Sequence, residues 1–237
     1  MRIAPLALAL GLVPAKALGA GTVIEGDPQP AAPTPSLAWT ATILRPVPAR
    51  AAPAPRARVV KRLTGQTPFS RRTEVLLVTG ARAVGARRWV QVQLPARPNG
   101  VTGWVPADAA ILATTPVRIR VRLASRSVEV YRAGRRVAAY PAAVGAPATP
   151  TPVGLFAVYD PVPTSGQLAP VIMVLTAYSP VLQTFLGGTG VAAIHGWPDP
   201  GVLGQAVSHG CIRLSRSAAG AVSRLAEPGV PVTIDRT

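Results

Sequence analysis

Proline and glycine punctuate this chain throughout, and this limits the folds that it can adopt. Of its 237 residues, 27 are proline and 22 are glycine. Proline breaks the interior of a helix, and glycine destabilises one. The composition therefore predicts a mostly β protein with many turns rather than long helices. A chain of this length can form two small domains, each with its own hydrophobic core.

The most reactive side chains of the chain lie together in one segment. The single cysteine, Cys211, and both histidines, His195 and His209, fall within residues 194–214. A thiol becomes an effective nucleophile when a nearby imidazole accepts its proton. This clustering predicts a nucleophilic cysteine that has a histidine base.

The residues around the cysteine suit acyl transfer. Gly210 lets the backbone approach a substrate closely, and the amides near Cys211 are candidates for an oxyanion hole. Arg213 carries a fork-shaped cation that matches a carboxylate. Two imidazoles and a thiolate would also suit a catalytic zinc, but the two-residue step from His209 to Cys211 is tight for zinc ligands. No metal or cofactor is therefore expected. An inert, packed cysteine is the other alternative, and the clustering argues against it.

A family resemblance rests on the same segment. His195-Gly196, followed twelve residues later by Ser208-His209-Gly210-Cys211-Ile212-Arg213, resembles the signature of YkuD-type L,D-transpeptidases. Residues 144–158 resemble a second segment of that family, with the pattern V-G, then T-P-x-G-x-F. The likeness covers about residues 116–234. It implies a β-sandwich-like mixed sheet as the catalytic fold.

The resemblance also implies roles for these residues. Cys211 would attack a peptidoglycan stem peptide at meso-diaminopimelate, release D-alanine, and pass the acyl group from a thioester to another stem. His195 would be the base, oriented by a backbone carbonyl near Gly196. The substrate and the surrounding loop would be positioned by Ser208, His209 and Arg213. If water resolved the same thioester, the enzyme would be an L,D-carboxypeptidase. A non-catalytic, basic wall-binding protein is the alternative from another class.

The order of the elements predicts two β domains. Strands are expected at 75–79, 89–94 and 103–105 in a first domain, residues 39–114. Its W-x-x-V and G-W-V strands resemble bacterial SH3-like modules, which bind the cell wall or serve only for packing. In the second domain, residues 115–237, strands are expected at the following ranges: 116–123, 127–131, 135–140, 170–177, 191–194 and 230–234.

Two further local features belong to the second domain. Arg118, Arg120 and Arg122 alternate with apolar residues, and we expect them to form a solvated face of a strand. One clear helix is expected over 216–226, with Ser215 as its N-cap.

The amino terminus and the charge bear on location and partners. Residues 1–20 have the layout of a secretory signal peptide, with an apolar run too short to span a bilayer. Residues 21–38 are rich in proline and alanine and resemble a linker. The net charge of +16 comes almost wholly from arginine. The arginines are spread out and aromatic residues are few, which argues against nucleic acid. Export to the cell wall or periplasm is expected, where stem peptides and anionic wall polymers would be the partners.

Overall fold

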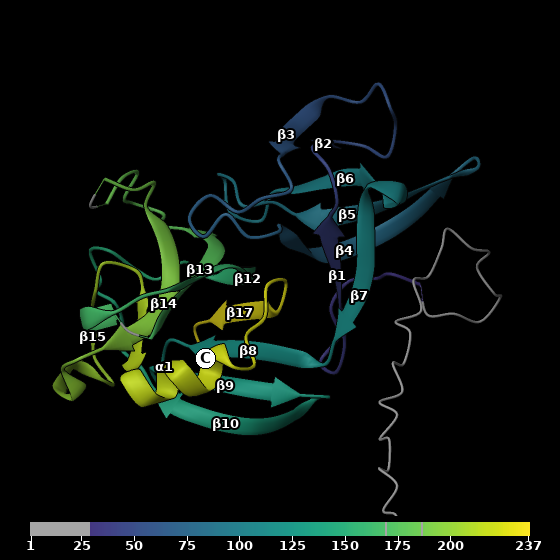
Figure 1. Cartoon of the computed structure of the whole chain (residues 1–237). Helices are drawn as coiled ribbons and strands as arrows, with labels where there is room; N and C mark the ends of the chain where they lie inside the picture. The colour runs from purple at the N-terminus through teal and green to yellow at the C-terminus, as the bar shows by residue number, and fades with distance from the viewer. Residues whose placement is uncertain (1–28, 169, 186) are drawn as a thin grey trace, which may run out of the picture.

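Nearly all of the regular secondary structure among the described residues is β-strand (Figure 1). This computed structural model describes residues 29–168, 170–185 and 187–237. The signal segment expected at 1–20, and the first part of the linker expected at 21–38, lie outside the described residues. No helix in the described part of the chain is long and apolar enough to cross a membrane.

The first sheet is formed by the amino-terminal half and has seven strands in the spatial order β3-β2-β6-β5-β4-β1-β7. Alternating apolar side chains such as Val90 and Val92 on β5 form its buried core. The three strands predicted in this half are present, and the first runs on to Val84. Its elements are β1 (Ala38–Ile43), β2 (Val47–Arg50), β3 (Val59–Leu63), β4 (Val75–Val84), β5 (Arg87–Gln93), β6 (Thr102–Pro106), a 3-10 turn η1 (Ala107–Ala109) and β7 (Ala110–Thr115).

The second sheet is mixed and has eight strands in the order β10-β9-β8-β17-β12-β13-β14-β16. Two of its pairs, β17 with β8 and β14 with β16, are parallel. A separate short pair joins β11 to β15. Its strands are β8 (Val117–Arg122), β9 (Ser127–Arg132), β10 (Arg135–Pro141), β12 (Gly154–Pro163), β13 (Val171–Tyr178), β14 (Val191–Trp197), β16 (Ile212–Ser215) and β17 (Pro231–Asp235), with β11 (Val144–Gly145), β15 (Ala206–Ser208) and the 3-10 turns η2 (Gly166–Leu168) and η3 (Pro200–Val202) beside them.

The arginine stripe on β8 is paired rather than simply solvated, so that expectation is corrected. Arg120 Nε lies 2.6 Å from the Asp235 carboxylate. Arg122 lies 3.8 Å from the buried Glu129 carboxylate, and Arg118 covers the Tyr131 ring at 4.4 Å. The pairing strands β9 and β17 supply these partners, so the stripe ties neighbouring strands together.

One α-helix, α1 (Arg216–Ser223), is present among the described residues. Ser215 caps it as predicted, since its hydroxyl accepts a hydrogen bond from the Ala218 N–H at 3.1 Å. The helix ends three residues earlier than predicted, at a point where Pro228 soon follows; the residue before a proline is disfavoured in helical conformation. The helix packs against β13, β14 and β16, the strands that lead to the candidate site.

The two sheets meet through buried contacts. Tyr159, on β12 of the second sheet, packs into the core of the first sheet. The Asp160 carboxylate is fully buried and accepts hydrogen bonds from the backbone N–H groups of Phe69 and Ser70, at 2.9 and 3.1 Å. A carboxylate with two such donors closes the junction without an unpaired charge.

Candidate active site

A tight turn that precedes β16 presents the cysteine. The Ser208 hydroxyl donates to the Cys211 carbonyl at 2.5 Å and accepts from the Gly210 N–H at 3.1 Å. Gly210 has φ of +115°, a conformation that side-chain-bearing residues rarely adopt. The Thr149 hydroxyl donates to the Ser208 carbonyl at 2.9 Å and ties this turn to the segment before β12. Ser208 therefore fixes the backbone on both sides of the thiol.

Parallel pairing brings the cysteine beside the strand that carries His195. On β14 and β16, Ile194 pairs with Ile212 and His195 pairs with Arg213. The residue before Ile212 is Cys211, and its thiol interacts with the backbone of Ala193. Cys211 thus lies beside Ala193, two residues before His195 on β14.

The His195 imidazole is held in its neutral form. Its ring is buried, and Nδ1 lies 2.8 Å from the Gly196 carbonyl, the contact that the resemblance implied. A carbonyl only accepts, so Nδ1 carries the proton and Nε2 is left to accept another. Burial lowers the pKa of His195, and the nearby Arg213 cation lowers it further. The imidazole is therefore uncharged at neutral pH.

The thiol of Cys211 is also held uncharged in the resting site. Burial raises its pKa, while a backbone hydrogen bond from Ala193 and the Arg213 cation act in the opposite direction. With the pKa of His195 lowered, the favoured resting state is thiol and imidazole rather than an ion pair.

Arg213 is stacked beside these two groups. Its guanidinium carbon lies 3.8 Å from the centroid of the Trp197 ring. Its Nε–H is buried and has no hydrogen-bond acceptor among the described residues. An unpaired buried donor is costly, so an acceptor brought by a bound molecule would offset that cost.

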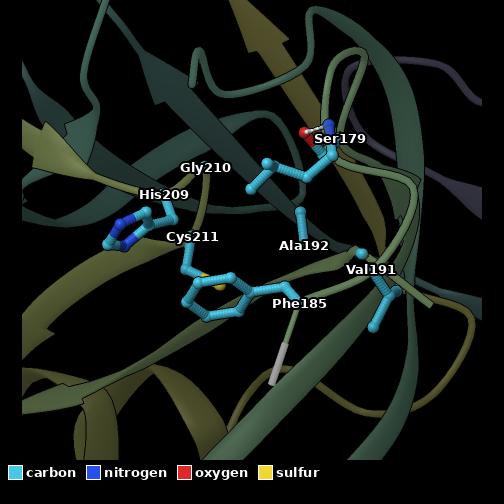
Figure 2. A pocket seen from close by; sticks show the side chains of 9 residues that line it. Ser179, Phe185, Val191, Ala192, His209, Gly210 and Cys211 are labelled. Atoms are coloured by element: carbon cyan, nitrogen blue, oxygen red, sulfur yellow. Dashed lines mark hydrogen bonds between the residues drawn. The ribbon is translucent and has the colours of Figure 1, made fainter. Parts of the chain in front are cut away.

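The thiol opens into a small pocket, drawn in Figure 2. The Phe185 ring and the exposed His209 ring stack at its mouth, with centroids 4.9 Å apart. The pocket volume is about 10 Å³, which is at the lower limit for one water molecule. The lining residues are Ser179, Leu182, Phe185, Gly190, Val191, Ala192, His209, Gly210 and Cys211.

The structure divides the predicted site residues into two groups. His209, Gly210 and Cys211 line the pocket itself. The other predicted residues do not line it: His195 and Gly196 lie on β14, Ser208 ends β15, and Arg213 lies on β16.

Sequence reasoning missed the loop between β13 and β14. Residues 179–185 and 187–190 of this loop are described, and we call them the pocket loop. It contributes Ser179, Leu182, Phe185 and Gly190 to the lining. A glycine cluster between two predicted strands marked a loop there, but no pattern assigned it to the site.

Among the residues that the structure describes, no three His, Cys, Asp or Glu side chains come together in a group that could hold a metal ion.

Residues 116–234 match the YkuD family, described as the L,D-transpeptidase catalytic domain. No curated protein sequence matches the chain.

Solved L,D-transpeptidase structures are similar at low identity. One from Mycobacterium tuberculosis is 21% identical, with 83% of this chain and 93% of that chain covered and a TM-score of 0.47. One from Mycobacterium smegmatis is 17% identical, with coverages of 67% and 98% and a TM-score of 0.42. One from Enterococcus faecium is 21% identical over 50% of this chain, with a TM-score of 0.39. This chain spans 49% of that enterococcal protein.

The family assignment rests on the match at residues 116–234. That match covers half of the 237 residues and includes every predicted site residue. The chain belongs to the YkuD family of L,D-transpeptidase catalytic domains.

Proposed function

We propose that this protein is a peptidoglycan L,D-transpeptidase that cross-links stem peptides through a thioester on Cys211. One observation carries the proposal: the single cysteine lines a pocket and directly precedes the strand that pairs with the one that carries His195. The Nδ1 atom of His195 lies 2.8 Å from the Gly196 carbonyl. That tautomer leaves Nε2 ready to accept the thiol proton.

The acylation step follows from the protonation states. The Cys211 sulfur attacks the carbonyl carbon of the donor stem, and its proton passes to His195. A carbon–sulfur bond forms and the carbonyl oxygen becomes an oxyanion. When this intermediate collapses, the carbon–nitrogen bond breaks and the leaving amine takes the proton from His195. The product is a thioester on Cys211.

The second step regenerates the enzyme. An acceptor amine of another stem gives a proton to His195 as it attacks the thioester carbonyl. The new carbon–nitrogen bond forms, the carbon–sulfur bond breaks, and the sulfur takes the proton back. Water in place of the amine would give an L,D-carboxypeptidase by the same route.

Two groups near the sulfur suit the developing negative charge. The Gly210 N–H is already hydrogen-bonded to Ser208, so the N–H of Cys211 itself is the stronger candidate for the oxyanion donor. Arg213 favours the thiolate by its charge, and its unpaired donor suits a carboxylate of the donor stem.

The size of the pocket implies that substrate entry displaces part of the wall. A stem peptide is much larger than the pocket volume of about 10 Å³, which is at the lower limit for one water molecule. Phe185 is 38% exposed and stacks on the exposed His209 rather than packing into the core. These two rings are the part of the wall that costs least to move, and His209 would then contact the bound stem.

The rest of the chain fits an exported wall enzyme. We assign residues 115–237 to the catalytic domain and 39–114 to the SH3-like domain. The signal-like residues 1–20 support export to the cell wall or periplasm, and the net charge of +16 suits anionic wall polymers.

The test is incubation of the purified protein with a disaccharide tetrapeptide, followed by mass spectrometry of products and of intact protein. We expect cross-linked dimers, free D-alanine, and an acylated protein mass that disappears in Cys211→Ala. Cys211→Ala should keep the wild-type circular dichroism and lose turnover by roughly a thousandfold or more. Shortened stems without dimers would assign the carboxypeptidase instead, and turnover by Cys211→Ala would refute the nucleophile.

A further inference from the structure

The pocket loop forms one wall of the candidate site, yet no other described residue of the second half hydrogen-bonds to it. Its own hydrogen bonds are internal: the Ser179 N–H donates to the Gly190 carbonyl at 2.8 Å, and Phe185 and Gly188 exchange backbone bonds at 3.0 and 2.9 Å. The Ser179 hydroxyl also accepts from the Leu182 N–H at 3.0 Å. These bonds shape the loop but do not fix it against Cys211.

A residue of the first sheet supplies the fixed attachment. Arg97 lies in the loop between β5 and β6, and its guanidinium donates to three carbonyls of the pocket loop. The acceptors are Ser179 at 2.7 Å, Leu182 at 2.8 Å and Thr189 at 3.2 Å. Among the described residues, Arg97 is the one residue outside the pocket loop that hydrogen-bonds to it.

The three acceptors span the whole loop. Ser179 opens it and Thr189 lies near its end, so a single rigid fork holds both ends and the middle. Two of the three acceptor residues, Ser179 and Leu182, also line the pocket. The backbone at Gly190 passes so close that a Cβ there would lie 2.3 Å from the Leu182 oxygen and 3.1 Å from Arg97. The guanidinium of Arg97 thus lies inside the turn of the loop. We call its three hydrogen bonds to the loop the bracket.

The same β5–β6 loop also holds the strand end that feeds the pocket loop. Asn99 binds the backbone of Tyr178 on both sides, donating to its carbonyl and accepting from its N–H, each at 2.8 Å. The Tyr178 hydroxyl donates to the Pro95 carbonyl at 3.2 Å, and Arg97 lies 4.9 Å from the centre of its ring. Residues 95, 97 and 99 of the first half therefore all contact Tyr178 or the pocket loop in the second half.

Arg97 is exposed, as are most arginines of this strongly basic chain. An exposed arginine gains little from a single surface contact, and its side chain loses rotamer freedom when it is held. Arg97 makes three charge-assisted hydrogen bonds from one planar guanidinium. Its side chain loses rotamer freedom only once for all three bonds, so the entropy cost per bond is smaller.

We propose that Arg97 is a positioning residue of the active site, which sets the pocket loop against Cys211 from the first sheet. Asn99 supports it by fixing Tyr178, where the loop begins. The amino-terminal half is then a working part of the catalytic site as well as a neighbouring module. This inference deepens the proposed function and rests on it for its effect on turnover, but the geometry at the thiol is testable without any substrate.

The test compares Arg97→Met and Arg97→Lys with the wild-type full chain. Methionine keeps the aliphatic stem and removes every donor, while lysine keeps the charge but not the fork. Arg50→Met is the matched control, because Arg50 also donates to a carbonyl, that of Ala57 at 2.8 Å, but within the first sheet. The readouts are the rate and pH midpoint of iodoacetamide alkylation of the single cysteine, and separately kcat and KM with the stem peptide.

Releasing the loop should admit water to the thiol. In Arg97→Met we expect alkylation at pH 8 to be faster and the pH midpoint to fall, because less burial means a lower thiol pKa. At the same time kcat with the stem peptide should fall about tenfold, the size expected for loss of charged hydrogen bonds. Arg97→Lys should recover part of both values, and Arg50→Met should match wild type.

Other results would overturn the inference. Wild-type alkylation kinetics in Arg97→Met would show that the loop stays in place without the bracket. Equal changes in Arg97→Met and Arg50→Met would show a general loss of stability. If Arg97→Met does not fold, Asn99→Ala provides the same test at the neighbouring anchor, with the same opposite changes in alkylation and kcat expected. If wild type turns over no stem peptide, the alkylation results still decide the role of Arg97, and only the proposed function fails.

Discussion

The phenol of Tyr159, on β12, donates a hydrogen bond of 2.9 Å to the carboxylate of Glu74, which directly precedes β4 of the first sheet. Both side chains are buried. Burial raises the pKa of Glu74, and burial together with the neighbouring carboxylate raises the pKa of Tyr159. The junction between the sheets therefore contains a polar pair whose members depend on each other.

Tyr159→Phe should weaken this junction. It leaves a buried carboxylate with one partner fewer, at a cost of about 1–3 kcal/mol in the free energy of unfolding. The pKa of Glu74 is raised, so the folded state holds its proton more tightly than the unfolded chain, and stability is lost as pH rises above 4.5. The deficit of the mutant should accordingly shrink toward pH 4.5.

Urea unfolding at several pH values measures this effect. Tyr140→Phe is the control, since the Tyr140 hydroxyl makes no hydrogen bond among the described residues and lies away from the junction. Equal stability of the two mutants at pH 7 would mean that the hydrogen bond contributes nothing.

The isolated segment 115–237 should fold less stably than the full chain. Tyr159 and Ala157 are buried in the intact protein against residues of the first sheet, and separation exposes both to water. We expect a lower urea midpoint and faster alkylation of Cys211, because Arg97 is absent as well. A segment as stable as the whole protein, with unchanged thiol reactivity, would show that the halves are independent.

Removal of each histidine should have different effects. His195→Gln removes the proton acceptor, and we expect acylation by the stem peptide to slow by about 10²–10⁴. His209→Ala should cost less, because this exposed ring stacks on Phe185 at the mouth of the pocket. Single-turnover acylation, followed by intact mass, separates the two. A larger loss in His209→Ala would reverse the assignment of the base.

Arg213 should set the pH at which the thiol reacts. Burial raises the pKa of Cys211 above its ordinary value of 9.0, and the Arg213 cation opposes that rise. Arg213→Gln should therefore move the midpoint of iodoacetamide alkylation to still higher pH. The folded state also keeps the thiol proton longer than the unfolded chain, so stability should fall as pH rises through 9.0, and Cys211→Ala should reduce that slope. An unchanged midpoint in Arg213→Gln would place its charge out of reach of the sulfur.

The sequence pattern predicted those elements whose conformation depends on residues that are close together in the chain. The alternation that begins at residue 117 gave β8, with Ile119 and Val121 fully buried. Ala133 and Gly134 both have positive φ, at 49° and 80°, in the turn between the strands expected at 127–131 and 135–140. Ser215 capped α1 because its hydroxyl competes well for the first free N–H groups. Each of these depends on neighbours in sequence.

The parts that were missed depend on neighbours in space. The register that sets His195 opposite Arg213 is a long-range pairing, and no periodicity in either strand encodes it. Arg97 and Ser179 are separated by 82 residues, and an exposed arginine in a basic chain gives no sign of its acceptors. The arginine face of β8 was misjudged for the same reason, since Glu129 and Asp235 come from other strands.

The bracket from Arg97 to the pocket loop makes the two halves thermodynamically linked. Coupling between two sites is reciprocal. If Arg97 favours the loop position that binds a molecule in the pocket, that molecule stabilises the hydrogen bonds of Arg97 to the loop by the same free energy. Acylation of Cys211 would then strengthen the contact between the two sheets. The force or denaturant concentration needed to separate the sheets would report whether Cys211 is acylated.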